Sequence, residues 1–275
     1  MNALDDVTFI LTADFDEIKR RVEEFADSIK KRARNVASRA EIREAIKNAL
    51  IMYKARSRVQ KASGVSIDRL LEVELQSLDL AADALSRRWY NSIMTKAISV
   101  KALAQTARVD GEGIEIGNDV YDPRTIEAIW SAATKRYGSS TTVPYANGVN
   151  YPAKIYYEQK EHSVLADANR NAMASAAMAD GIMFMTTDFT GTTDSCRFHE
   201  GKLFLTSEIL REFAVREFGQ VVNKLYSVEQ IKTDRTHMFK FGCKHTLIPS
   251  AVQYDQNASA LLSQSVYKVP KVVKE

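Results

Sequence analysis

Apolar residues recur at helical spacing through most of the first hundred residues, which predicts long amphipathic helices there. Ser38 is followed three residues later by Glu41, a pairing typical of a helix N-terminus, so we expect two helices with a break near residues 35–38. Gly64 marks the end of the second of these helices, and a further helical pattern with an apolar stripe starts at Ser66. The apolar positions before Gly64 are Phe15, Ile18, Val22, Phe25, Ile29, Ile42, Ile46, Ala49, Leu50 and Tyr53.

The second half of the chain is patterned in shorter segments. Three glycines around Ile114 and Ile116 predict a turn with a short hairpin, and a domain boundary just before it. Asp122 and Pro123 fit the start of a helix that ends before Gly138. Beyond it we expect a loop over residues 139–153, a helix over about 155–180, strands at 182–185 and 202–205, a helix at 207–218 and a final strand near 237–248.

These segments predict an α+β fold with a long helical N-terminal half and a smaller α+β domain that holds a few short strands. The expected domains are residues 1–107 (helical) and 108–256 (α+β), followed by an extended C-terminal tail at 257–275.

Composition excludes several broad classes of protein. The 275 residues are 45% hydrophobic and 27% charged, which argues against disorder throughout the chain. No stretch approaches the roughly 18 consecutive apolar residues that a membrane-spanning helix needs. The first residues are acidic and lack a basic-then-apolar signal pattern, so we expect folding in the cytosol, with no membrane among the partners. Two cysteines do not make a disulfide scaffold.

Each of these two cysteines has a histidine close by in the sequence. Cys196 and His199 form a C-x2-H pair, and Cys243 and His245 form a C-x-H pair. Zinc favours four tetrahedral sulfur and nitrogen ligands, so one interpretation is a structural zinc site made of all four. Cysteine is also often buried for packing alone, and a Cys/His nucleophile is a third interpretation. The spacing leaves all three open.

Several acidic residues flank the first cysteine. Asp188, Asp194 and Glu200 lie in or beside a Thr/Gly-rich loop. They are compatible with a carboxylate metal site or an acid/base pair, but acids in such loops more often form turns. We therefore expect a turn-forming role for them.

Residues 28–63 carry a concentration of positive charge. This segment is +9, whereas the rest of the chain is −6. Contact with nucleic acid, contact with an acidic protein surface and a merely solvated helix face all remain open. The basic residues are Lys30, Lys31, Arg32, Arg34, Arg39, Arg43, Lys47, Lys54, Arg56, Arg58 and Lys61.

Two segments of the C-terminal half carry a resemblance to a known family. In the first, a strand and a polar loop lead to Cys196 and His199 and then to Gly201-Lys202-Leu203-Phe204. The second is Gly242-Cys243-Lys244-His245, which is followed by Pro249. In order and spacing these segments, over residues 182–249, resemble the phage Mu F-like head morphogenesis family. The loop before Cys196 departs from the family's usual Arg-rich stretch.

The resemblance implies a minor capsid protein of the virion that is not an enzyme, assembled in the host cytoplasm and needed for head assembly or DNA delivery. Its implied partners are the portal protein and the major capsid protein, with packaged double-stranded DNA as a further contact and no small-molecule substrate. The Cys/His core would then hold a small domain together, and the structural zinc ion that the ligand types allow is the cofactor expected there. Two alternatives are a nuclease or toxin-like hydrolase that uses His199 and nearby acids, and a DNA-binding accessory protein.

Overall fold

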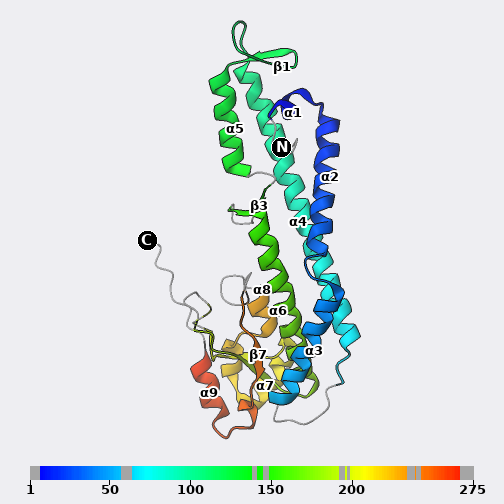
Figure 1. The fold of residues 1–275 in the computed structure, drawn as a ribbon. Coiled ribbons are helices and arrows are strands. Elements are labelled where there is room, and N and C mark those ends of the chain that lie inside the picture. The colour runs from blue at the N-terminus through cyan, green and yellow to red at the C-terminus, as the bar shows by residue number, and fades with distance from the viewer. Residues whose placement is uncertain are drawn as a thin grey trace. The chain divides into compact units, whose positions relative to one another are not determined.

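The computed structural model describes residues 7–56, 64–137, 141–144, 149–191, 196, 199–233, 239 and 243–266 (Figure 1). It confirms the predicted α+β class: long helices dominate the N-terminal half, and short antiparallel strands appear in the C-terminal half. Across the described residues, no helix combines the length and the apolar character that a membrane span requires.

The chain forms two compact units, one made of residues 1–36 and 76–158 and the other of residues 37–75 and 159–275. Each unit combines an early segment of the chain with a later one. Both units therefore contain residues from either side of the domain boundary that the sequence predicts at residue 107. The physical reason is that α3 (Arg39–Arg56) packs against β7 (Leu247–Pro249) in the second unit. In the same unit, the Tyr53 hydroxyl donates a 3.0 Å hydrogen bond to the Asp180 carboxylate.

The first unit is built mainly from helices. They are α1 (Val7–Thr12), α2 (Phe15–Arg34), most of α4 (Ile67–Ala104), α5 (Pro123–Tyr137) and the start of α6 (Ala153–Ala179). Its core includes Ile18, Val22, Met94 and Val100, which lie on the predicted apolar stripes or continue them. The expected hairpin is present as β1 (Ile114–Ile116) and β2 (Asp119–Tyr121).

Side chains cap the starts of both α2 and α3, and the sequence predicted the second of these caps. The Asp14 carboxylate accepts a 2.7 Å hydrogen bond from the amide of Glu17 at the start of α2. Before α3, the Ser38 amide donates to the Glu41 carboxylate at 2.7 Å and the Glu41 amide donates to the Ser38 hydroxyl at 3.2 Å. This reciprocal pair confirms the capping box and the interruption between α2 and α3.

The second unit is organised around a three-stranded antiparallel sheet. Strands β5 (Phe184–Thr187), β6 (Leu203–Leu205) and β7 lie in the order β6-β5-β7. Met185 pairs with Phe204 on one side and with Pro249 on the other. Around the sheet lie α7 (Arg211–Phe218), α8 (Val228–Thr233) and α9 (Ala258–Ser265). The two segments that carry the family resemblance thus contain or directly precede the three strands of one sheet.

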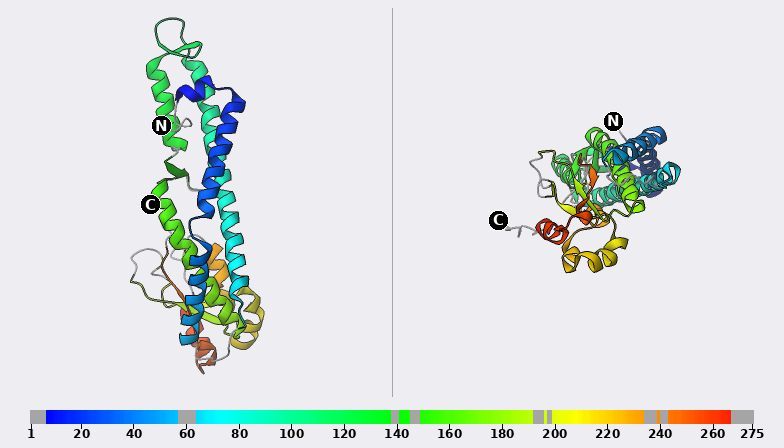
Figure 2. Two further views of the ribbon diagram at one scale, coloured as in Figure 1. Left: turned by 45° about the vertical axis from the view of Figure 1, so that its right-hand side comes forward. Right: turned by 90° about the horizontal axis from the view of Figure 1, so that it is seen from below.

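The structure corrects three expectations. The loop predicted at 139–153 contains a short hairpin, β3 (Thr142–Pro144) with β4 (Asn150–Pro152), in which Val143 is fully buried. The last strand is limited to Leu247–Pro249, and His237, where it was expected to begin, lies outside the described residues. The tail is not extended at Ala258–Ser265, because Ala258 and Leu262 pack into the core of the second unit and stabilise α9, the red helix in Figure 2.

Candidate metal centre

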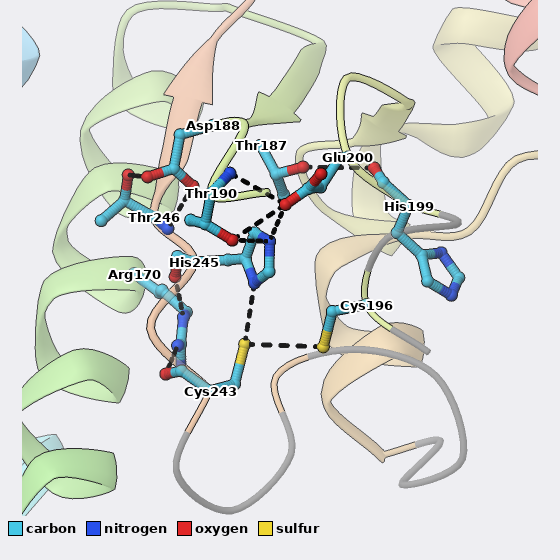
Figure 3. Close-up of polar contacts among 10 residues, drawn as sticks. All are labelled: Arg170, Thr187, Asp188, Thr190, Cys196, His199, Glu200, Cys243, His245 and Thr246. Carbon is cyan, nitrogen blue, oxygen red and sulfur yellow. Dashed lines mark hydrogen bonds and ion pairs between the residues drawn. The ribbon is translucent and has the colours of Figure 1, made fainter. Parts of the chain in front are cut away.

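The two cysteines lie on separate loops of the second unit that meet beside the sheet (Figure 3). Cys196 lies between β5 and β6, and Cys243 lies just before β7. Their sulfur atoms are 4.0 Å apart, and the Cys243 Sγ is 3.3 Å from the Nδ1 of His245. Among the described residues, the donor atoms of Cys196, Cys243 and His245 all lie within 4.8 Å of one another. The structure therefore brings together three of the four predicted ligands.

His199, the fourth predicted ligand, is not part of this group in the described residues. Its amide donates a 2.9 Å hydrogen bond to the Cys196 carbonyl, which shapes the turn between β5 and β6. The side chain is 1% exposed and its ring centroid lies 6.4 Å from that of Phe204. Figure 3 shows the ring pointing away from the two sulfur atoms. A C-x2-H spacing places two residues on one turn but does not decide which way their side chains point.

A buried carboxylate lies behind His245. The Nε2 of His245 is 2.8 Å from a carboxylate oxygen of Glu200, whose side chain is only 8% exposed. The same oxygen accepts hydrogen bonds from the amide and hydroxyl of Thr190, both at 2.8 Å. With Nε2 directed to a carboxylate, Nδ1 is the nitrogen that faces the cysteines. This arrangement fixes the orientation of the imidazole, as outer carboxylates do in zinc sites.

Arg170 holds the backbone that carries Cys243 and His245. Its guanidinium, on α6, donates to the carbonyl of His245 at 2.8 Å and to that of Cys243 at 2.5 Å. It also pairs with Asp167 at 2.7 Å and lies over the Phe239 ring at 4.5 Å. Arg170 is 1% exposed, so its guanidinium is shielded from water, whereas the Asp167 side chain that it contacts is 45% exposed. One side chain thus fixes both ends of the C-x-H segment.

A further set of hydrogen bonds joins the loop after β5 to the residue before β7. Both carboxylate oxygens of Asp188 accept hydrogen bonds from Thr246, from its amide at 2.8 Å and from its hydroxyl at 3.0 Å. The hydroxyl of Thr187 donates to the His199 carbonyl at 3.2 Å. Asp188 therefore joins two segments that are 58 residues apart and does not form the local turn expected for it, whereas Glu200 lies inside the cluster. Asp194 lies outside the described residues.

The surroundings shift the ionisation of two side chains in the cluster. The hydrogen bond with Cys196 lowers the pKa of the Cys243 thiol to about 5, helped by the charge of Arg170 and by contacts with His245, and opposed by burial. Burial disfavours the charged form of His245, but hydrogen bonds to Glu200 and Cys243 raise its pKa above the usual value. The cluster thus favours a thiolate at Cys243, the form in which cysteine binds metals.

The donor geometry fits a tetrahedral metal ion. With Zn–S distances of about 2.3 Å and a Zn–N distance of about 2.0 Å, two sulfurs on one ion lie about 3.8 Å apart, and a sulfur and a nitrogen about 3.5 Å apart. The corresponding distances here are 4.0 Å and 3.3 Å. Both agree with a tetrahedral ion to within about 0.2 Å, and the third pair of donors, the Cys196 sulfur and a His245 nitrogen, lies within 4.8 Å.

Several cations of the basic segment pair with acids of the chain itself. In the first unit Lys30 pairs with Asp83 at 2.6 Å and Arg34 with Asp79 at 2.6 Å. These contacts lower the pKa values of both aspartates. In the second unit the partners are acids at the start of α4: Arg39 pairs with Glu72 at 2.5 Å and Arg43 with Asp68 at 2.7 Å.

The remaining cations of the segment have varied surroundings. Lys47 lies 3.7 Å from Glu44 on the same helix, and Arg32 lies 4.0 Å from the Tyr157 ring centroid. Lys31, Lys54 and Arg56 are exposed, whereas Arg58 and Lys61 lie outside the described residues. Five of the nine cations of the segment that the structure describes are therefore paired with acids of the chain.

Sequence reasoning missed Arg170 and misjudged Glu200. Arg170 lies in a helix with buried residues on several sides, among them Ala168, Ala172 and Met173. A cation that is buried in a helix must be paired, but the polar neighbours Asp167, Asn169 and Asn171 obscure this signal in the sequence. Glu200 had no local signal, because its partner His245 is 45 residues away.

A cavity of about 790 Å³ also lies in the second unit, beside the sheet and α9. Its lining includes Lys202, Leu203, Tyr254 and Leu261, but none of the four predicted metal ligands. We regard the Cys/His cluster as the functional candidate because its donor atoms converge on one point.

Comparisons of the chain with models of protein families, with curated proteins and with solved structures found no match.

Proposed function

We propose that this chain is a structural minor protein of a phage head, in which a zinc ion held by Cys196, Cys243 and His245 clasps the C-terminal sheet. One observation carries the proposal. The segments that resemble the phage Mu F-like family form or directly precede three strands of a single sheet, and their cysteines and one histidine meet beside it. A metal ion that joins two loops stabilises the folded state, because its binding free energy adds directly to the free energy of folding.

Zinc is the ion that this donor set favours. Two thiols and an imidazole select borderline or soft cations, whereas magnesium and calcium prefer oxygen ligands. The Glu200 carboxylate at the far nitrogen of His245 is the outer contact that zinc-bound imidazoles usually make. The role we propose for the ion is structural.

The proposed partners are the portal protein and the major capsid protein, with packaged DNA as a lesser contact. Release of counterions from DNA requires cations that are not already paired. Lys30, Arg34, Arg39 and Arg43 are held by acids of the chain, which favours protein partners. The hydrolase alternative lacks similar support, because a His199 side chain that is 1% exposed is poorly placed to reach a polymeric substrate.

The virion role predicts a clear genetic and proteomic result. In a lysogen that encodes the chain, deletion of its gene should leave the host viable but strongly reduce the titre of infectious particles, and the wild-type gene should restore it. Mass spectrometry of purified particles should find the chain at low copy number. An unchanged titre together with particles that lack the chain would contradict the proposed function.

The metal centre predicts about one zinc ion per chain in protein purified without chelator, measured by elemental analysis. Cys196→Ser, Cys243→Ser and His245→Ala should each lower the content below about 0.2 per chain. His162→Gln, at an exposed position on α6, is the matched control and should keep the metal. His199→Gln should keep it too, since that ring points away from the cluster; loss of zinc in this variant would favour the four-ligand site expected from the sequence.

A further inference from the structure

The two cysteines are placed for a reaction with each other. They are the only cysteines in the chain, and their sulfur atoms are 4.0 Å apart. A disulfide requires a separation of about 2.05 Å, so an approach of about 2 Å is enough to form the bond. Both residues lie on loops outside the strands of the sheet, where such an adjustment disturbs little regular structure.

The two thiols differ in exposure, which gives them different roles. Cys196 is 2% exposed, whereas Cys243 is only partly buried. A small oxidant from solvent therefore meets the sulfur of Cys243 first. The Cys196 sulfur lies behind it, within reach for a second step but shielded from the solvent.

We propose that Cys196 and Cys243 are a site of oxidative modification, at which a peroxide converts the pair into an intramolecular disulfide and displaces the bound metal. The disulfide follows from the geometry of the pair alone. The displacement of zinc rests on the proposed function.

The reaction balances in two steps. The Cys243 thiolate attacks one oxygen of hydrogen peroxide, the O–O bond breaks, and a sulfenic acid forms while hydroxide leaves and is protonated to water. The Cys196 sulfur then attacks the Cys243 sulfur, the S–O bond breaks, and the departing hydroxide takes the Cys196 proton to give a second water. Two thiols lose two electrons in total, and one peroxide is reduced.

Oxidation exchanges one cross-link for another. A disulfide sulfur is a poor zinc ligand, so the ion would keep only His245 of its three protein ligands. The covalent bond joins the same two loops, so the sheet stays clasped. A protein that assembles in reducing cytoplasm and then leaves with a particle would in this way keep its C-terminal fold after losing the metal.

The test uses the full chain in metal-free form, treated with hydrogen peroxide and analysed by intact mass and peptide mapping. We expect the wild type to lose about 2 Da and to yield one peptide pair joined through Cys196 and Cys243. Cys196→Ser should instead accumulate a sulfenic acid at Cys243, trapped by dimedone. Cys243→Ser should leave Cys196 largely unmodified under the same conditions.

Zinc-loaded protein should form the disulfide more slowly than metal-free protein and should release its zinc to a chelating dye as the disulfide appears. Disulfides only between chains, or a sulfenic acid that forms first on Cys196, would overturn the proposal. If zinc binds but peroxide gives no internal disulfide, this inference fails and the metal clasp stands. If the disulfide forms but no zinc binds in either state, the metal clasp fails and the oxidation site stands.

Discussion

Replacing Arg170 with methionine is expected to lower the free energy of unfolding by about 3 kcal/mol or more. The substitution keeps much of the side-chain volume but removes the donors that the carbonyls of Cys243 and His245 accept from. Both carbonyls would then lack their charged donor in an environment that excludes water, and Asp167 would lose its ion-pair partner. Urea denaturation followed by circular dichroism measures the change.

Two further variants separate the contacts of Arg170 from charge in general. Arg69→Met removes an exposed arginine of the same compact unit and should change the stability by less than about 0.5 kcal/mol. Arg170→Lys keeps the charge but cannot span both carbonyls, so it should recover only part of the loss. If Arg170→Met were as stable as Arg69→Met, the guanidinium would not organise the C-x-H segment.

Removal of zinc by a chelator is expected to lower the melting temperature by on the order of 10 °C. An ion that binds only the folded state, at a thousandfold excess over its dissociation constant, adds about 4 kcal/mol of stability. In a chain of this size each kcal/mol shifts the melting temperature by about 2–4 °C. Differential scanning calorimetry of the wild type, with and without chelator, provides the measurement.

The experiment needs a reductant that is not itself a thiol, so that a Cys196–Cys243 disulfide cannot replace the metal. Cys243→Ser is the control, because its melting temperature should be low and insensitive to the chelator. Equal melting temperatures for the wild type with and without chelator would show that any bound ion adds nothing to the fold.

The sequence by itself determined most of the helical framework. Capping residues such as Asp14 and Ser38, and apolar stripes with a period of 3.6, act within a few residues of each other, so local patterns report them directly. Pairing of the basic segment within the chain was not among the interpretations drawn from the sequence, although the acids follow a helical pattern. The acids Asp68, Glu72, Asp79 and Asp83 recur along α4 at spacings of four and seven residues, which places them on one helix face.

Only the tertiary structure shows which side chains make up the candidate metal centre. The sequence identified both Cys/His pairs, but a spacing does not determine side-chain direction, and so it did not separate His245, which faces Cys243, from His199, which does not. Glu200 and Arg170 meet their partners across 45 to 75 residues of chain. Such contacts form because the sheet order β6-β5-β7 brings the loop after β5 and the loop before β7 together, beside α6, and no local pattern records where distant segments will meet.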